Sequence, residues 1–130
     1  MREGGTSANH YAAIAIAVQG VQALPWQRMP QPVETVAIDR YIVDALMRDL
    51  VGHDRQPSAF LVYLFLWHET HGRKLATTQM ALIDIAEGVG LSKRGVQDAL
   101  GHLGKRKLIA VARESITAVP VYTVLRPWRR

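Results

Sequence analysis

The sequence contains no cysteine among its 130 residues. It therefore offers no disulfide framework and no thiolate metal site, and it needs no oxidising compartment. Long hydrophobic runs are also missing, because the longest, Ala59 to Trp67, is about half of the roughly 20 residues that cross a bilayer as a helix. These absences predict a cytoplasmic protein without a membrane partner. The length of the chain fits one compact domain with an N-terminal extension.

No pattern typical of an enzyme is present. The segment His68-Glu69-Thr70-His71 resembles the zinc-protease helix motif, but its histidines are three residues apart instead of four, and no third ligand is evident. The pair Gly4-Gly5 is not a phosphate loop, and no nucleophile lies beside a base in a readable pattern. The sequence therefore predicts no catalytic activity, no cofactor and no metal.

Acidic residues are scarce toward the C-terminus. Residues 91 to 130 hold nine basic side chains and two acidic ones, a net charge of +7 (9 − 2), whereas the whole chain carries +5 and its first 90 residues −2. This division predicts a polyanion-binding face on the C-terminal part, with nucleic acid favoured over lipid because no basic amphipathic membrane helix accompanies it. An ordinary solvated basic surface is the alternative.

The chain divides by composition into a partly disordered arm, residues 1 to 35, and a folded domain, residues 36 to 130. Three prolines at 25, 30 and 32 interrupt the arm, and its alternation of Ile14, Ile16 and Val18 fits a strand or a helix equally well.

The domain begins with two predicted helices. An apolar stripe at helical spacing predicts the first from Val36 to Val51, ending at Gly52; its members are Ile38, Tyr41, Ile42, Ala45, Leu46 and Leu50. The second, from Ser58 to Thr70, is apolar nearly all round, so it is buried on most sides or packs on a second subunit. The apolar excess on both helices predicts a homodimer.

From Leu75 onward the sequence predicts a strand, two helices joined by a turn, and two more strands. The segments are 75 to 80, 82 to 87, a turn at 88 to 91, 92 to 106, 108 to 113 and 118 to 125. The fold class is therefore mainly α with a small β-hairpin.

The segment IDIAEGVGLSKRGVQDALGHLGKRKLIAV resembles the helix-turn-helix and first wing strand of bacterial winged-helix transcriptional regulators, and the resemblance covers roughly residues 58 to 126. Ala86, Gly90, Val96 and Ala99 occupy the small, turn and apolar positions of that motif. Two departures are Ala81, where a Ser or Thr cap is typical, and the glycines at 95, 101 and 104 in the second helix. The resemblance implies a winged helix-turn-helix (α+β) with a recognition helix at 92 to 106 and a wing at 108 to 125.

A recognition helix reads DNA with the exposed residues near its N-terminus. Lys93, Arg94 and Gln97 are therefore the candidates for base contacts, and Ser92 is the candidate for both helix cap and phosphate contact. Lys105 and Arg106 lie at the far end of the helix, where they would either contact the DNA backbone or stabilise the helix C-terminus. Arg113 lies at the start of the hairpin turn of the wing, from which it would reach an adjacent minor groove or its phosphates, or remain solvated.

These features predict sequence-specific binding of double-stranded DNA and transcriptional regulation. Two alternatives remain open, because a fold alone does not define a function. One is the winged-helix domain of a replication or plasmid and phage maintenance protein, and the other is a protein interaction module, which would expose apolar or acidic residues in place of Lys93, Arg94 and Lys105.

Overall fold

The computed structural model describes residues 34 to 129. Every helix and strand described below belongs to one compact unit, Val36–Arg130. The predictions made for the arm, including the strand or helix around Ile14 to Val18, lie outside the described residues.

The first helix is wound as two consecutive π-helical segments, η1 (Ile42–Leu46) and η2 (Arg48–His53). The amide of Met47 donates to the carbonyl of Ile42, and the amide of Asp54 donates to Asp49, both five residues back. Its inward face contains the buried residues Ile42, Leu46 and Leu50, which belong to the predicted stripe.

The bounds of this helix correct the predicted range of Val36 to Val51. The residues before the helix are held by contacts from distant parts of the chain: the Trp67 indole donates to the carbonyl of Ala37 at 2.8 Å, and the Trp128 indole donates to Asp39 Oδ2 at 2.8 Å. The helix also continues through Gly52 to His53. Ile38 and Tyr41, predicted to face the core, are therefore 38% and 42% exposed.

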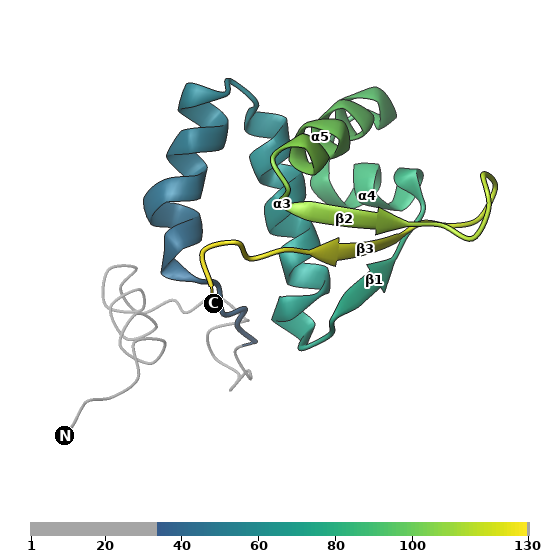
Figure 1. The fold of residues 1–130 in the computed structure, drawn as a ribbon, viewed down its shortest axis with the longest axis horizontal. Coiled ribbons are helices and arrows are strands. Elements are labelled where there is room, and N and C mark those ends of the chain that lie inside the picture. The colour runs from purple at the N-terminus through teal and green to yellow at the C-terminus, as the bar shows by residue number, and fades with distance from the viewer. Residues whose placement is uncertain (1–33, 130) are drawn as a thin grey trace, which may run out of the picture. The chain divides into compact units, whose positions relative to one another are not determined.

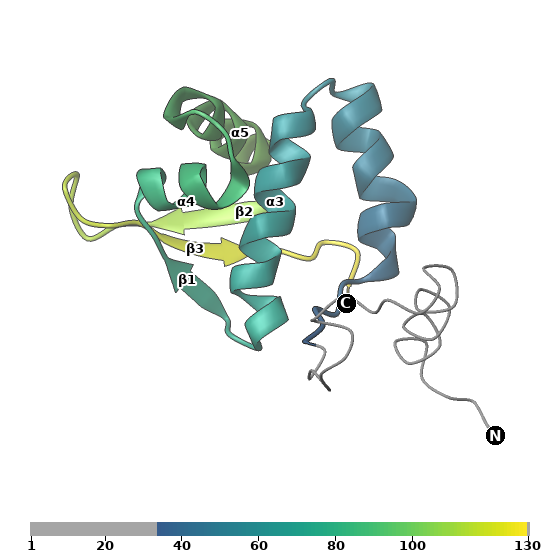
Figure 2. The same ribbon diagram turned by 180° about the vertical axis from the view of Figure 1, so that it is seen from behind.

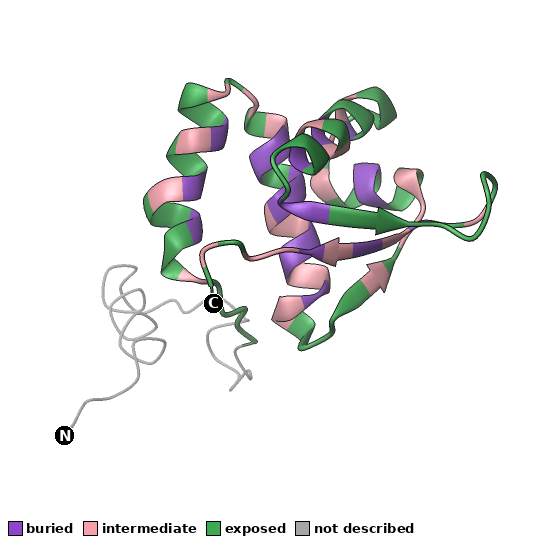
Figure 3. Cartoon of the chain, viewed as in Figure 1, coloured by how far each residue is buried: buried purple, intermediate pink, exposed green. Residues whose placement is uncertain are grey.

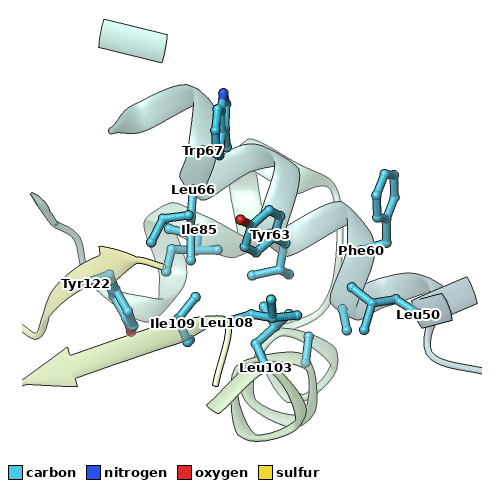
Figure 4. Packing of buried hydrophobic residues seen from close by; sticks show 14 of the residues in the cluster. Leu50, Phe60, Tyr63, Leu66, Trp67, Ile85, Leu103, Leu108, Ile109 and Tyr122 are labelled. Atoms are coloured by element: carbon cyan, nitrogen blue, oxygen red, sulfur yellow. The ribbon is translucent and has the colours of Figure 1, made fainter. Parts of the chain in front are cut away.

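Helix α3 (Pro57–Glu69) is the centre of the core (Figures 1 and 4). Its apolar character all round is explained within one chain, because η2, α4, α5 and the sheet all contact it. Six of its residues are buried: Ala59, Phe60, Val62, Tyr63, Leu66 and Trp67. Each large side chain among them contributes about 1.5–3 kcal/mol of hydrophobic stabilisation.

Three short antiparallel strands form one sheet in the order β1-β3-β2. Strand β1 (Thr77–Gln79) pairs with β3 (Val121–Val124), and β3 pairs with β2 (Ile109–Ala112) so that Ile109 lies opposite Val124. Tyr122 and Val124 are buried and alternate with half-buried residues, as expected for a sheet with one face on the core. The protein is thus mainly helical with a small three-stranded antiparallel sheet, an α+β arrangement.

Between β1 and β2 the chain forms α4 (Leu82–Val89) and α5 (Lys93–Lys105), which pack against each other and on α3 (Figures 1 and 2). Val96, Ala99 and Leu103 are buried on the inward stripe of α5, and Leu100 is half-buried against the core. The predicted order of elements from Leu75 to Leu125 is confirmed, with each strand shorter than its predicted segment.

The C-terminal segment after β3 packs back onto the first helix. Trp128 stacks on Tyr41 with ring centroids 4.8 Å apart, and Arg129 Nε donates to Asp39 Oδ2 at 2.8 Å. Arg129 lowers the pKa of Asp39 to about 2, mainly through this hydrogen bond. Trp128 therefore packs on the domain. Among the described residues, no helix is long and apolar enough to cross a membrane.

Candidate nucleic-acid interface

The turn between α4 and α5 is set by two residues that the sequence identified. Gly90 ends α4 with a φ of 85°, in the left-handed region that favours glycine, and its amide donates to the carbonyl of Ala86 at 2.8 Å. Ser92 begins α5 as its N-cap, with Oγ accepting the Gly95 amide at 3.0 Å. The predicted turn glycine and the predicted helix cap are confirmed, and Ala81 precedes α4 as an N-cap residue without a side-chain hydrogen bond, as its sequence indicates.

The close packing of α4 on α3 depends on a glycine that the sequence placed in the turn. Gly88 lies inside α4, and a Cβ at this position would be 2.4 Å from Cζ of Phe65. Ala86 is also buried on this helix. Small residues at both positions therefore let α4 approach the core, which positions the start of α5.

Lys93, Arg94 and Gln97 are exposed in the N-terminal half of α5. Figure 3 shows exposed and buried residues alternating along the helices of the domain. Gln97 lies three and four positions from the other two, so the three residues share one helix face. Arg94 Nε lies 3.5 Å from Asp98 Oδ1, but both side chains are largely exposed, so this pair is weak. The face is therefore basic, and the free amides at the helix N-terminus add partial positive charge beside Ser92.

Glycines lie further along the same helix. Gly101 and Gly104 are exposed, and a Cβ added at either would meet no atom within 4 Å. Nothing in the described part of the chain requires glycine at these positions, and each lowers the intrinsic stability of the helix by about 1 kcal/mol relative to alanine.

The far end of α5 is tied to the preceding helices through Asp54. Arg106 Nε lies 2.9 Å from Asp54 Oδ2, and His102 Nε2 lies 2.7 Å from the same oxygen. Arg106, predicted as a DNA contact, is thus engaged within the protein, whereas Lys105 is exposed and forms no ion pair with a described residue.

Asp54 is an ionised group in a nearly closed environment, with 8% of its side chain exposed. Hydrogen bonds from His53 and His102, together with the nearby charge of Arg106, lower the pKa of Asp54 to about 2. This carboxylate thus joins the turn after η2 to the last two turns of α5. Sequence reasoning missed it, because its partner His102 is 48 positions away.

Arg113 lies in the loop between β2 and β3, as predicted, and is exposed. Its Nη1 donates to the carbonyl of Ile116 at 3.4 Å, which directs the side chain along its own loop. This loop and α5 enclose a groove of about 540 Å³ that includes Gln97, Gly101 and Arg113. Its rim is apolar, because Val111 and Ile116 are 48% and 91% exposed.

The predicted site residues therefore fall into three groups. Ser92, Lys93, Arg94 and Gln97 lie together at the start of α5. Gln97 and Arg113 line one groove, although they are far apart in sequence. Lys105 and Arg106 lie at the other end of α5, and of these two only Lys105 is without an ion pair to a described residue.

The histidines that resemble a zinc motif are used in structural contacts. His71 Nε2 bonds to the carbonyl of Val124 at 3.0 Å, and His68 Nε2 lies 3.7 Å from the carboxylate of Glu69. Within residues 34 to 129, no three His, Cys, Asp or Glu side chains are grouped to hold a metal ion.

Comparison with known proteins finds no matching family model, no matching curated protein and no matching solved structure.

Proposed function

We propose that this protein binds double-stranded DNA sequence-specifically as a winged helix-turn-helix, with α5 as the recognition helix and the β2–β3 hairpin as the wing. In this proposal it acts as a cytoplasmic transcriptional regulator and carries no enzymatic activity. The observation that carries the proposal is the exposed basic face at the N-terminus of α5, a helix that Ser92 caps. This helix follows the turn that begins at Gly90.

The chemistry of each residue gives it a role on DNA. Lys93 and Arg94 have donors that suit the acceptor edge of guanine, and the Gln97 amide suits adenine. Ser92 and the free amides of the first turn suit a phosphate. Lys105 and Arg113 suit flanking backbone, while Arg106 positions α5 through Asp54 instead of contacting DNA.

The main rival is a protein interaction module, and one observation favours it. The groove between α5 and the β2–β3 loop has an apolar rim formed by Val111, Ile116 and Val119. Against it, the helix face that borders this groove through Gln97 also exposes Lys93, which forms no ion pair with a described residue, and charged residues are depleted at the centre of protein interfaces. The exposed basic face of α5 therefore supports DNA over a protein partner.

The proposal is tested by fluorescence anisotropy of a labelled mixed-sequence duplex over a range of salt concentrations. The wild-type protein should bind with an affinity that falls steeply with salt. The variant Lys93→Ala/Arg94→Ala should bind more weakly, because α5 loses the two cations of its N-terminal face.

The matched control is Arg40→Ala/Arg48→Ala, which removes the same charge from exposed positions of the first helical region. It should bind the duplex nearly as the wild type does. Absence of binding at low salt, or equal affinity for the two double variants, would contradict the proposal and favour the protein interaction module.

A further inference from the structure

Apart from the groove beside α5, a hollow lined by basic residues lies at the end of the sheet opposite the β2–β3 loop. Its walls are the turn after α3, with His71 and Lys74, and the segment after β3, with Arg126 and Arg129. The cavity has a volume of about 690 Å³, which is within the range of small-molecule sites. It belongs to neither the α5 face nor the groove beside it.

The charge of this hollow is strongly positive. Lys74, Arg126 and Arg129 line it, and no carboxylate of a described residue does. Arg129 is bonded to Asp39, and the charge of Arg126 also acts on this carboxylate, whereas Lys74 forms no ion pair with any described residue. Three cations near one carboxylate leave a net positive charge in this hollow, which attracts an anion.

The walls of the hollow are fixed to the core before any ligand binds. His71 Nε2 donates to the Val124 carbonyl at 3.0 Å and so joins one wall to the other. The Tyr63 hydroxyl donates to the Leu125 carbonyl at 2.9 Å, which ties the second wall to α3. A site fixed in this way loses little conformational entropy when it binds a ligand.

Lys74 itself has an unusual backbone conformation. Its φ is 61°, a left-handed value that non-glycine residues rarely adopt and that costs about 1 kcal/mol or more. The Lys74 amide is held by the His71 carbonyl at 3.0 Å, which maintains this conformation. The turn therefore keeps a lysine at the rim of the hollow at some cost in stability.

We propose that this hollow binds a free small molecule bearing a phosphate group, recognised by Lys74 and Arg126, with the Arg129 guanidinium completing the site. Arginine supplies planar paired donors that match phosphate oxygens, and lysine adds a point charge. A free ligand is favoured over a DNA phosphate because the segment after β3, which lines the hollow, lies at the opposite end of the sheet from the β2–β3 loop (Figure 1). This inference does not depend on DNA binding.

The test is an NMR titration of the ¹⁵N-labelled full chain with inorganic pyrophosphate. Saturable shifts are expected in the backbone amides of Ala76, Thr123 and Leu125, which line the hollow. The variant Lys74→Ala/Arg126→Ala should bind at least about tenfold more weakly, because two charge-assisted contacts are lost. The charge-matched variant Arg40→Ala/Arg48→Ala should bind as the wild type does.

Shifts that do not saturate, or equal binding by both double variants, would overturn the proposal and indicate general ionic screening. A second measurement identifies the source of the phosphate, using the affinity of Lys74→Ala/Arg126→Ala for a DNA duplex. An unchanged duplex affinity supports the free ligand. A loss as large as that of Lys93→Ala/Arg94→Ala would overturn the free-ligand assignment and make the phosphate a DNA phosphate.

Discussion

At the scale of single residues, Asp54 has the most contacts to explain. It is an ionised carboxylate that forms hydrogen bonds with His53 and His102 and an ion pair with Arg106. These contacts hold the half of α5 that lies farther from the proposed DNA contacts. No local pattern in the sequence marks it, because its importance depends on which distant side chains the fold brings to it. The same is true of Asp39, which binds Trp128 and Arg129.

The variant Asp54→Asn should lower the free energy of unfolding by about 1–2 kcal/mol, measured by urea denaturation. The loss is modest because His102 and Arg106 are 24% and 41% exposed, so water replaces part of the interaction. Asp98→Asn, at an exposed position of α5, is the control and should change stability by less than about 0.5 kcal/mol. Equal effects of the two substitutions would show that the contacts of Asp54 with His102 and Arg106 do not stabilise the fold.

The pH dependence of stability follows from the same carboxylates. The pKa of Asp54 and that of Asp39 are both lowered from 3.8 to about 2. A lowered pKa in the folded state stabilises fully above the unfolded value, and this stabilisation is lost as pH falls through the folded value. Stability should therefore decline from about pH 4 toward pH 2, followed by circular dichroism. Asp39→Asn/Asp54→Asn should show a shallower decline, and an unchanged slope would contradict this assignment.

Glycine substitutions separate two backbone roles. Gly101→Ala should stabilise the protein by about 0.5–1 kcal/mol, because the position is helical, exposed and open. Gly90→Ala should destabilise it by about 1 kcal/mol or more, because its φ of 85° strains any L-residue. Urea denaturation measures both, and stability changes of the same sign would be inconsistent with these two backbone assignments.

At the scale of elements, the sequence predicted best where local chemistry sets the geometry. Ser92 caps α5 and Gly90 ends α4, so both the turn and the start of the predicted recognition helix followed from residue types. The first helix was predicted too early because Ala37 and Asp39 are bound by Trp67 and Trp128, contacts that no periodicity reveals. The apolar groove beside α5 was missed for the same reason, since it needs Gln97 and the β2–β3 loop to meet.

Removal of the Ser92 cap tests the element that carries the proposed interface. Ser92→Ala should destabilise the protein by about 1 kcal/mol, since the Gly95 amide loses its acceptor. Ser92→Asp should preserve the cap, but its charge should weaken duplex binding if a phosphate lies at this helix end. Equal duplex affinity of the aspartate variant and the wild type would place the phosphate elsewhere.

At the scale of the whole molecule, the predicted homodimer remains a prediction. Helix α3 is largely buried within one chain, and one apolar surface of the described residues that could contact a second copy is the outer face of η1 and η2, where Val43, Met47 and Val51 are 47%, 38% and 38% exposed. A two-fold dimer would present two α5 helices to half-sites about one DNA turn apart.

Sedimentation velocity at tens of micromolar should detect this dimer, and Met47→Glu should convert it to a monomer by placing a charge in the contact. Ile83→Glu is the control, because it changes an apolar residue that is 45% exposed on α4 instead. A wild-type protein that is wholly monomeric at these concentrations would exclude a two-fold dimer of useful affinity.

The central claim is that the N-terminal face of α5 binds DNA, and an NMR titration of the labelled protein with a mixed-sequence duplex tests it most directly. We expect amide shifts to concentrate in Ser92 to Gly101 and around Arg113, and added salt to reverse them. Shifts confined to the first helical region, or no shifts at low salt, would contradict the claim.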